Sequence, residues 1–192
     1  PIGVRNTTTS GQYADKIGSL TFPNFIEEDS ARGKASRDSL RGDLETFKEE
    51  FASLGIVLGA RYDGSPLIVS DGTAPPPDEP AKYIPSATPG GRMPHYWIGE
   101  TESIFDKLGF WFTLAQVGPG APDVSAFKQA ANDLGLPLTI VQVKEVGALE
   151  LYGASLLLLR PDQHIAWRGD AVPEDVPGIL SVVIGKLALS NI

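Results

Sequence analysis

The sequence contains no cysteine among its 192 residues. This absence excludes disulfides, thiolate nucleophiles, iron–sulfur clusters, zinc-thiolate sites and dithiol redox chemistry. There are only two histidines, His95 and His164. A metal site would therefore have to combine both of them with nearby carboxylates.

Basic residues are also scarce, with 16 lysines and arginines against 24 acidic residues and a net charge of -8. Nucleic acids and anionic membrane surfaces attract basic proteins, so both classes of partner are disfavoured. The longest aliphatic run, Leu156–Leu159, ends at Arg160, far short of the roughly 20 residues that span a bilayer. A hydrophobic content of 42% is typical of a globular chain. We expect a cytoplasmic protein with no nucleic-acid or membrane partner.

The chain begins with Pro1 instead of methionine, so we expect a processed or excised N-terminus. Four of the eight residues from Thr73 to Pro80 are prolines, which predicts a stiff connector. Irregular, glycine- and proline-rich sequence continues to Gly91. We therefore place a boundary within 73–91 and expect two parts, residues 1–80 and 81–192.

The first part contains one amphipathic pattern. Its large apolar residues recur at spacings of four, three, four and three: Leu40, Leu44, Phe47, Phe51 and Leu54. This spacing predicts a helix over 34–54, with Ser36 or Asp38 as N-cap and Gly55 just past its end. Nothing in 1–33 is expected to cover its apolar stripe.

Residues 56–62 and 65–70 are two short β-type runs on either side of Asp63-Gly64, a pair that favours a tight hairpin turn. We therefore predict a β-hairpin after the helix.

The second part predicts an α/β fold. Apolar runs indicate strands at 110–116, 138–143, 154–160 and 165–168, and periodic segments indicate helices over 123–134 and 174–189. Asp123 or Ser125 would cap the first of these helices and Gly135 would end it. The order β-α-β, then a hairpin, then a helix is that of a thioredoxin-like core. The predicted fold is thus a thioredoxin-like β-α-β-β-β-α domain preceded by a helix and a β-hairpin appendage.

Redox chemistry is not expected of such a core. Residues 117–122 lie where thioredoxin-like oxidoreductases carry Cys-x-x-Cys, and Tyr152-Gly153 replaces the proline that usually precedes the third strand. The fold would then serve as a packing module.

Two polar stretches are candidates for a functional surface. Asp162 and His164 could form an acid–base pair, although a hairpin turn with Asp162 accepting backbone N–H bonds is the simpler interpretation. Arg92 and His95 lie in a stiff segment, where an arginine beside aromatic residues could bind a carboxylate or phosphate, or fix the segment to a neighbouring domain. The interface candidates are Arg92, His95, Asp162, His164 and Arg168.

Known catalytic and cofactor motifs are absent: there is no GxGxxG, phosphate-binding P-loop, GxSxG or HExxH pattern. The tyrosines are best explained by packing. We therefore predict no catalytic, cofactor-binding or metal-ligating residue in this chain.

Three stretches, Leu58–Pro66, Pro89–His95 and Arg160–Gly169, together resemble the C-terminal third of FAD-dependent aromatic hydroxylases. That family includes phenol 2-monooxygenase, dichlorophenol hydroxylase and polyketide hydroxylases. The resemblance extends from about Leu54 to Gly185, and the stretch RPDQHIAWRG is its most specific part.

The resemblance implies a parent flavoprotein that binds FAD in an N-terminal domain, is reduced by NAD(P)H and uses O2 to hydroxylate a phenolic ring. It also implies a C-terminal domain without redox cysteines that serves packing and dimer contacts. The family's FAD-binding and catalytic residues precede the matched region, so none is transferred here. The implied partners are a missing N-terminal FAD domain and a second copy of the chain.

The first hypothesis is that this chain is the C-terminal structural and dimerisation portion of such a monooxygenase, inactive alone. The alternative is a free-standing, cysteine-less thioredoxin-like binding module. A hydrolase or isomerase that uses His164 with Asp162 is a third hypothesis.

Overall fold

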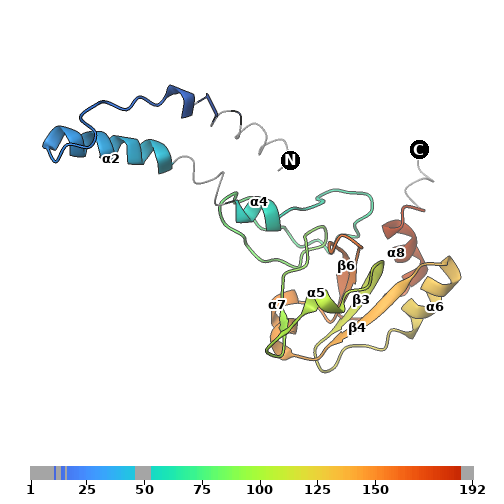
Figure 1. Ribbon diagram of the computed structural model, residues 1–192. Helices are drawn as coiled ribbons and strands as arrows, with labels where there is room; N and C mark the ends of the chain where they lie inside the picture. Colours follow the sequence, from blue (N-terminus) through green and yellow to red (C-terminus); the bar gives the residue numbers. More distant parts are fainter. Residues whose placement is uncertain (1–10, 12–13, 16, 46–52, 187–192) are drawn as a thin grey trace. The chain divides into compact units, whose positions relative to one another are not determined.

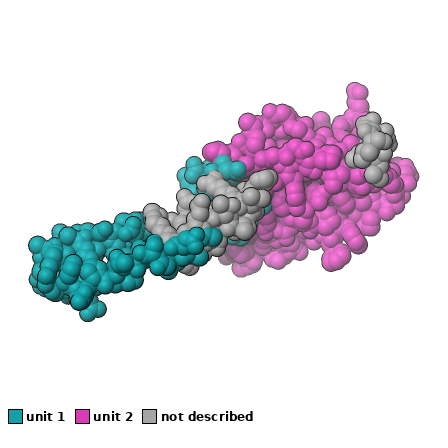
Figure 2. All heavy atoms as spheres, turned by 90° about the horizontal axis from the view of Figure 1, so that it is seen from above, with its two compact units in different colours: residues 1–60, 78–84 teal, residues 61–77, 85–192 magenta. Residues whose placement is uncertain are grey.

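The computed structural model describes residues 11, 14–15, 17–45 and 53–186. Contacts divide the chain into two compact units (Figure 2). Unit 1 comprises residues 1–60 and 78–84, and unit 2 comprises residues 61–77 and 85–192. No helix among the described residues is both long and apolar enough to cross a membrane.

Unit 1 contains helix α2 (Ala31–Glu45), preceded by helical residues at 11, 14–15 and 17–19. The predicted caps Ser36 and Asp38 are wrong. The side chain of Ser30 instead accepts the N–H of Gly33 at 3.2 Å, so the helix begins earlier. Gly33 is required there because a Cβ would collide with the backbone carbonyl of Glu28.

The predicted apolar stripe is only partly covered in unit 1. Leu40 is half-buried and Leu44 is exposed, whereas Phe47 and Phe51 lie outside the described residues.

Gly55 does not end the predicted helix, because it lies inside the short helix α4 (Leu54–Leu58). Its N–H donates to the carbonyl of Pro80 at 3.1 Å. A Cβ at this position would overlap the carbonyl of Glu79, so glycine permits the close approach of the two chain segments.

The predicted β-hairpin is wrong, although its turn forms. The N–H of Ser65 donates to the carbonyl of Tyr62 at 3.1 Å, and Gly64 has a φ of 71°. The flanking residues do not pair with each other: 56–58 are helical, Arg61 bridges Gly91, and the N–H of Val69 donates to Ala166 at 2.8 Å. The backbone of 61–69 finds its partners within unit 2 instead.

Unit 2 is built on a mixed four-stranded sheet (Figure 1). The strand order is β4-β3-β5-β6, with β3 and β4 parallel and the other neighbours antiparallel. The strands are β3 (Phe112–Val117), β4 (Leu138–Val143), β5 (Leu156–Leu159) and β6 (Ile165–Gly169). Helix α6 (Ser125–Leu134) connects β3 to β4, and α8 (Val176–Val183) follows β6. The predicted α/β class is confirmed, as are the parallel pair of the β-α-β unit and the antiparallel hairpin that follows it. The thioredoxin-like assignment stays a prediction.

Several short elements were not predicted. Helix α7 (Val146–Tyr152) lies between β4 and β5. Strands β1 (Trp97–Ile98) and β2 (Glu102–Ser103) form a small antiparallel ladder, and α5 (Ile104–Lys107) follows directly.

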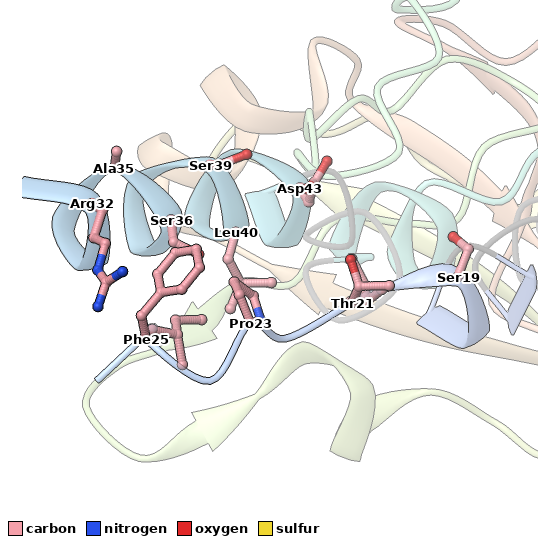
Figure 3. A pocket seen from close by; sticks show the side chains of 12 residues that line it. Ser19, Thr21, Pro23, Phe25, Arg32, Ala35, Ser36, Ser39, Leu40 and Asp43 are labelled. Carbon is pink, nitrogen blue, oxygen red and sulfur yellow. The ribbon is translucent and has the colours of Figure 1, made fainter. Parts of the chain in front are cut away.

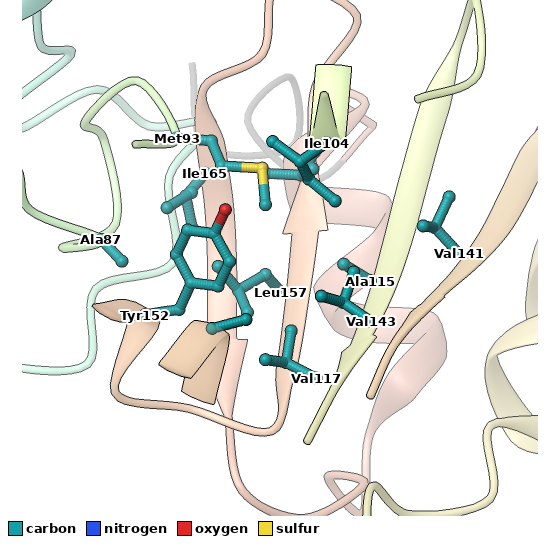
Figure 4. Close-up of a cluster of buried hydrophobic side chains, with 12 residues drawn as sticks. Ala87, Met93, Ile104, Ala115, Val117, Val141, Val143, Tyr152, Leu157 and Ile165 are labelled. Atoms are coloured by element: carbon teal, nitrogen blue, oxygen red, sulfur yellow. The ribbon is translucent and has the colours of Figure 1, made fainter. Parts of the chain in front are cut away.

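Two hydrophobic clusters cover opposite faces of the sheet, because successive strand residues point to opposite sides. Leu156 and Leu158 pack with residues of α6 and α8. Leu157 and Leu159 pack with Tyr152 of α7 in the other cluster, shown in Figure 4. The four leucines of β5 are fully buried, which explains their continuous apolar run.

For helix α6 the predicted end is confirmed, and the predicted N-cap is wrong. Gly135 ends α6 with a φ of 66°, as expected. Neither Asp123 nor Ser125 caps its start: Val124 is the N-cap residue, and Asp123 instead accepts the hydroxyl of Ser125 at 2.5 Å. Helix α8 begins at Val176 and ends at Val183, inside the predicted 174–189, of which 187–189 lie outside the described residues.

The outer edge of β6 is covered by irregular chain. Gly90 donates its N–H to Ile165 at 2.7 Å, Ile165 donates back to Gly91 at 2.9 Å, and Met93 donates to Gln163 at 2.9 Å. Such pairing satisfies the backbone groups of an edge strand. It also places the segment that carries Arg92 and His95 beside the turn between β5 and β6.

Candidate functional site

The turn from β5 to β6, residues 160–164, is closed by hydrogen bonds within it. The N–H of Arg160 donates to the carbonyl of His164 at 2.9 Å, and the N–H of Gln163 donates to that of Arg160 at 3.0 Å. Gln163 has a φ of 67°, the only left-handed backbone at a described residue other than glycine. The turn therefore holds its side chains in fixed positions.

Asp162 uses its carboxylate to stabilise this turn. It accepts Nη2 of Arg160 at 3.1 Å and the backbone N–H of His164 at 3.2 Å. Partial burial opposes ionisation, but these hydrogen bonds and the Arg160 charge outweigh it and hold the pKa of Asp162 below its usual value.

His164 is buried, with 8% of its surface exposed. Its Nδ1 lies 3.0 Å from the backbone carbonyl of Asp162 and 3.4 Å from the carboxylate Oδ1. Its ring packs on Tyr62 at a centroid distance of 4.6 Å, and the guanidinium of Arg160 lies 5.3 Å from the centre of the same Tyr62 ring. The geometry is that of a packed hairpin turn, the simpler of the two interpretations of Asp162 and His164.

Arg92 fixes the neighbouring segment to this turn. Its Nη2 donates to Oε1 of Gln163 at 2.6 Å, and its guanidinium carbon lies 4.8 Å from the centre of the Phe105 ring. His95 contacts the other aromatic residues nearby, with its ring 5.6 Å from Phe105 and 4.6 Å from Trp97. Arg92 and His95 thus share Phe105 as a common neighbour.

Arg168 lies in β6, away from this turn. Its Nε donates to Asp71 at 2.6 Å, its Nη1 to the carbonyl of Tyr152 at 3.0 Å and its Nη2 to the hydroxyl of Thr73 at 3.0 Å. The structure therefore brings Arg92, Asp162 and His164 together, places His95 beside them, and uses Arg168 as a separate anchor inside unit 2.

A hollow of about 650 Å³ opens beside the β5–β6 turn. We call it the aromatic hollow; its lining includes Phe105, Leu108, Phe110, Trp111, Arg160 and Gln163. Phe110 and Trp111 form an edge-to-face pair with ring centres 5.4 Å apart, and they are 86% and 54% exposed.

A second hollow, of about 610 Å³, lies within unit 1 between residues 19–26 and helix α2 (Figure 3). Leu40 points from α2 toward Pro23, so the segment before residue 33 does supply some cover for the apolar stripe, contrary to expectation. The lining is mainly aliphatic and hydroxyl side chains, and Arg32 is paired with Glu28. These groups suit packing of chain segments better than chemistry.

The described residues contain no group of three or more histidines and carboxylates that could hold a metal ion. His95 and His164 have different aromatic neighbours, Trp97 and Phe105 for the first and Tyr62 for the second. The arrangement gives no support to a metal site built on both.

Sequence reasoning missed the residues around Phe105. The signal was present in the run Phe110-Trp111-Phe112, because three consecutive aromatic residues cannot all face the core of an alternating strand. The strand in fact begins at Phe112 and leaves the first two exposed.

Comparison with known protein families finds one whose description is "Aromatic-ring hydroxylase, C-terminal", matching residues 86–186. This range covers the sheet of unit 2 and the helices packed on it.

Two curated relatives are much longer than this chain. The FAD-dependent monooxygenase opdD of Penicillium oxalicum is 30% identical over 77% of this chain and 29% of its own length. The phenol 2-monooxygenase of a Pseudomonas species is 29% identical over 91% of this chain and 30% of its own length. The chain thus spans less than a third of the length of these relatives.

Two solved structures likewise match most of this chain but only about a third of their own. The rebeccamycin biosynthetic enzyme RebC with reduced flavin matches 96% of this chain and 34% of its own, at a TM-score of 0.79 and 29% identity. The flavin-dependent monooxygenase PieE, in complex with FAD and substrate, matches 96% of this chain and 37% of its own, at a TM-score of 0.73 and 25% identity.

Proposed function

Because the chain belongs to the family of aromatic-ring hydroxylase C-terminal domains, we propose that it is the C-terminal structural portion of an FAD-dependent monooxygenase that hydroxylates phenolic aromatics. The match over 86–186 carries this proposal. The length of the relatives supports it, since more than two thirds of each lies outside the region that this chain matches. In this proposal FAD and NAD(P)H are bound by a preceding domain, and the part of residues 1–80 that lies in unit 1 belongs with the substrate-binding side of that domain.

The described loop between β3 and β4 does not fit the phosphates of FAD. A dinucleotide site needs a glycine-rich turn whose backbone N–H groups meet the phosphates at a helix N-terminus. The loop between the parallel strands β3 and β4 has Gly118 and Gly120, but its helix, α6, begins beside the carboxylate of Asp123. A hydrogen bond from Ser125 lowers the pKa of Asp123, so a negative charge stands where a phosphate would have to bind.

We further propose that unit 2 supports its parent by packing and by pairing with a second copy. The internal anchors favour a rigid platform: Arg168 ties the 71–73 segment to β6, and Arg92 ties the 90–93 segment to the β5–β6 turn. Sedimentation velocity tests the pairing, with a dimer expected for the parent enzyme. A parent that stays monomeric at all concentrations would remove the dimerisation role.

The genomic reading frame tests the main proposal. An uninterrupted frame upstream of Pro1 that encodes a glycine-rich dinucleotide motif, together with the matching intact mass of the native product, is the expected result. A native start codon immediately before Pro1 would instead favour the free-standing binding module.

A further inference from the structure

The aromatic hollow has the dimensions of a small-molecule site. Its volume of about 650 Å³ falls within the range of about 300–1,000 Å³ that is usual for ligand pockets. Its walls come from two places in the sequence, the 105–111 segment and the β5–β6 turn. Tight hydrogen bonds within that turn keep one wall in place.

The hollow offers faces and edges of aromatic rings to an incoming ligand. Phe110 and Trp111 stand at 89° to one another, so a planar ring can stack on one while it meets the edge of the other. Both side chains are more than half exposed. They therefore retain apolar area that a ligand would cover.

Gln163 supplies the polar group of the hollow. Its Oε1 accepts Arg92 at 2.6 Å, which fixes the orientation of the amide. The Nε2 end makes no hydrogen bond to any described part of the chain, and it can donate to an oxygen atom of a ligand.

The charge of the hollow argues against a strongly anionic ligand. Arg160 is the cation of its lining, and Nε and Nη2 of that side chain already bind the carboxylate of Asp162. A phosphate or sulfate group would have to compete with this carboxylate. A neutral oxygen acceptor would not.

From this arrangement we propose that the aromatic hollow binds a planar aromatic molecule that carries a neutral oxygen acceptor, such as a phenolic hydroxyl or a ring carbonyl. The ring stacks on Trp111 and meets Phe110 edge to face, and the oxygen accepts a hydrogen bond from Nε2 of Gln163. The proposal depends on the geometry of the hollow alone and is independent of what the parent enzyme does.

The test uses the 192-residue chain and 2-naphthol as probe, with 2-decalol, its saturated and non-planar counterpart, as the matched ligand control. Two-dimensional NMR of the indole N–H signals follows binding. Saturable shifts of the Trp111 signal with 2-naphthol, and at most weak ones with 2-decalol, are the expected result. No saturable Trp111 shift up to the solubility limit, or equal binding of the two compounds, would overturn the proposal.

Three variants locate the site, each first shown to be folded by its amide spectrum. Trp111→Ala should weaken 2-naphthol binding by about fivefold or more, as lost stacking and burial require. Gln163→Glu keeps an oxygen for Arg92 but removes the Nε2 donors, and should weaken binding by about threefold or more. Trp97→Ala removes a tryptophan of similar exposure, 57%, outside the hollow, and should leave binding unchanged.

Self-association is the competing occupant of the hollow. If the Trp111 signal shifts with protein concentration alone, together with a concentration-dependent sedimentation coefficient, a second copy covers the hollow and the ligand proposal is wrong. Equal loss of binding in Trp97→Ala and Trp111→Ala would overturn it as well.

Discussion

Arg168 and Asp71 lie 97 positions apart in the sequence, yet Nε of the arginine is 2.6 Å from Oδ2 of the aspartate. The same guanidinium also binds Thr73 and the carbonyl of Tyr152. One side chain in β6 therefore fastens both the 71–73 segment and the C-terminal end of α7. Both charged side chains are mostly shielded from water, so their contact is weakened little by solvent.

Removing the charge of Asp71 should loosen this anchor. We expect Asp71→Asn to lower the free energy of unfolding by about 1–2 kcal/mol, since hydrogen bonds to charged groups contribute about 1.5–3 kcal/mol and asparagine retains one acceptor. Urea denaturation followed by circular dichroism measures the change. In a double-mutant cycle with Arg168→Gln, the double variant should lose less free energy of unfolding than the sum of the two single variants.

The matched control is Glu102→Gln, which breaks the ion pair with Lys107, also 2.6 Å long but more exposed. Exposed pairs contribute about 0–1 kcal/mol, so the control should change stability by less than Asp71→Asn. Equal effects of the two substitutions would contradict the anchoring role of Arg168.

Stability should fall in acid because of Asp71 and Asp162. In each, partial burial raises the pKa, but hydrogen bonds and nearby arginines lower it more, so the net pKa lies below the usual value. A carboxyl whose pKa is lower in the folded state stabilises that state at pH values above its unfolded pKa of about 3.9. This contribution is lost as the pH falls through the lower, folded-state pKa.

The check is a series of urea denaturations between neutral pH and about pH 2.5. Asp162→Asn should lower the free energy of unfolding at neutral pH and should make that free energy fall less steeply below about pH 4. If the free energy of unfolding of Asp162→Asn falls with pH as steeply as that of the unaltered chain, this carboxyl has the same pKa in the folded and unfolded chains.

Two glycines should respond oppositely to substitution by alanine. Gly135 ends α6 with a φ of 66°, which a side chain disfavours, whereas Gly42 lies inside α2. A Cβ at either position would meet nothing within 4 Å, so backbone conformation alone decides the outcome. Gly135→Ala should lower stability by about 1 kcal/mol.

Gly42→Ala should instead stabilise helix α2 by up to about 1 kcal/mol, because alanine favours the helical backbone more than glycine does. Thermal unfolding followed by circular dichroism at 222 nm reports both changes. A stabilising Gly135→Ala would contradict the left-handed end of α6.

The sheet of unit 2 was predictable because its strands depend on local pattern. Residues 138–143 were predicted without error, and the strand predicted over 154–160 contains β5. The stop at Gly135 also followed from local conformation, since glycine readily adopts a positive φ.

The failures occur where distant segments determine the structure. The run 65–70 has β-type residues, but the N–H of Val69 donates to Ala166 of β6 and not to the run 56–62, the partner expected in the hairpin. Gly55 was expected to end a helix, yet it accommodates the carbonyl of Glu79. The contacts of Arg92 with Phe105 and Gln163 depend on the pairing of residues 90–93 with residues 163–165. No local sequence pattern predicts that pairing.

The central claim is that the flavin chemistry of the parent enzyme lies outside these residues. It is tested most directly by titrating the 192-residue chain, shown by its NMR spectrum to be folded, with FAD while flavin fluorescence and the visible absorption spectrum are recorded. We predict free-flavin fluorescence and an unshifted spectrum at every protein concentration. Saturable quenching with one FAD bound per chain would contradict the claim.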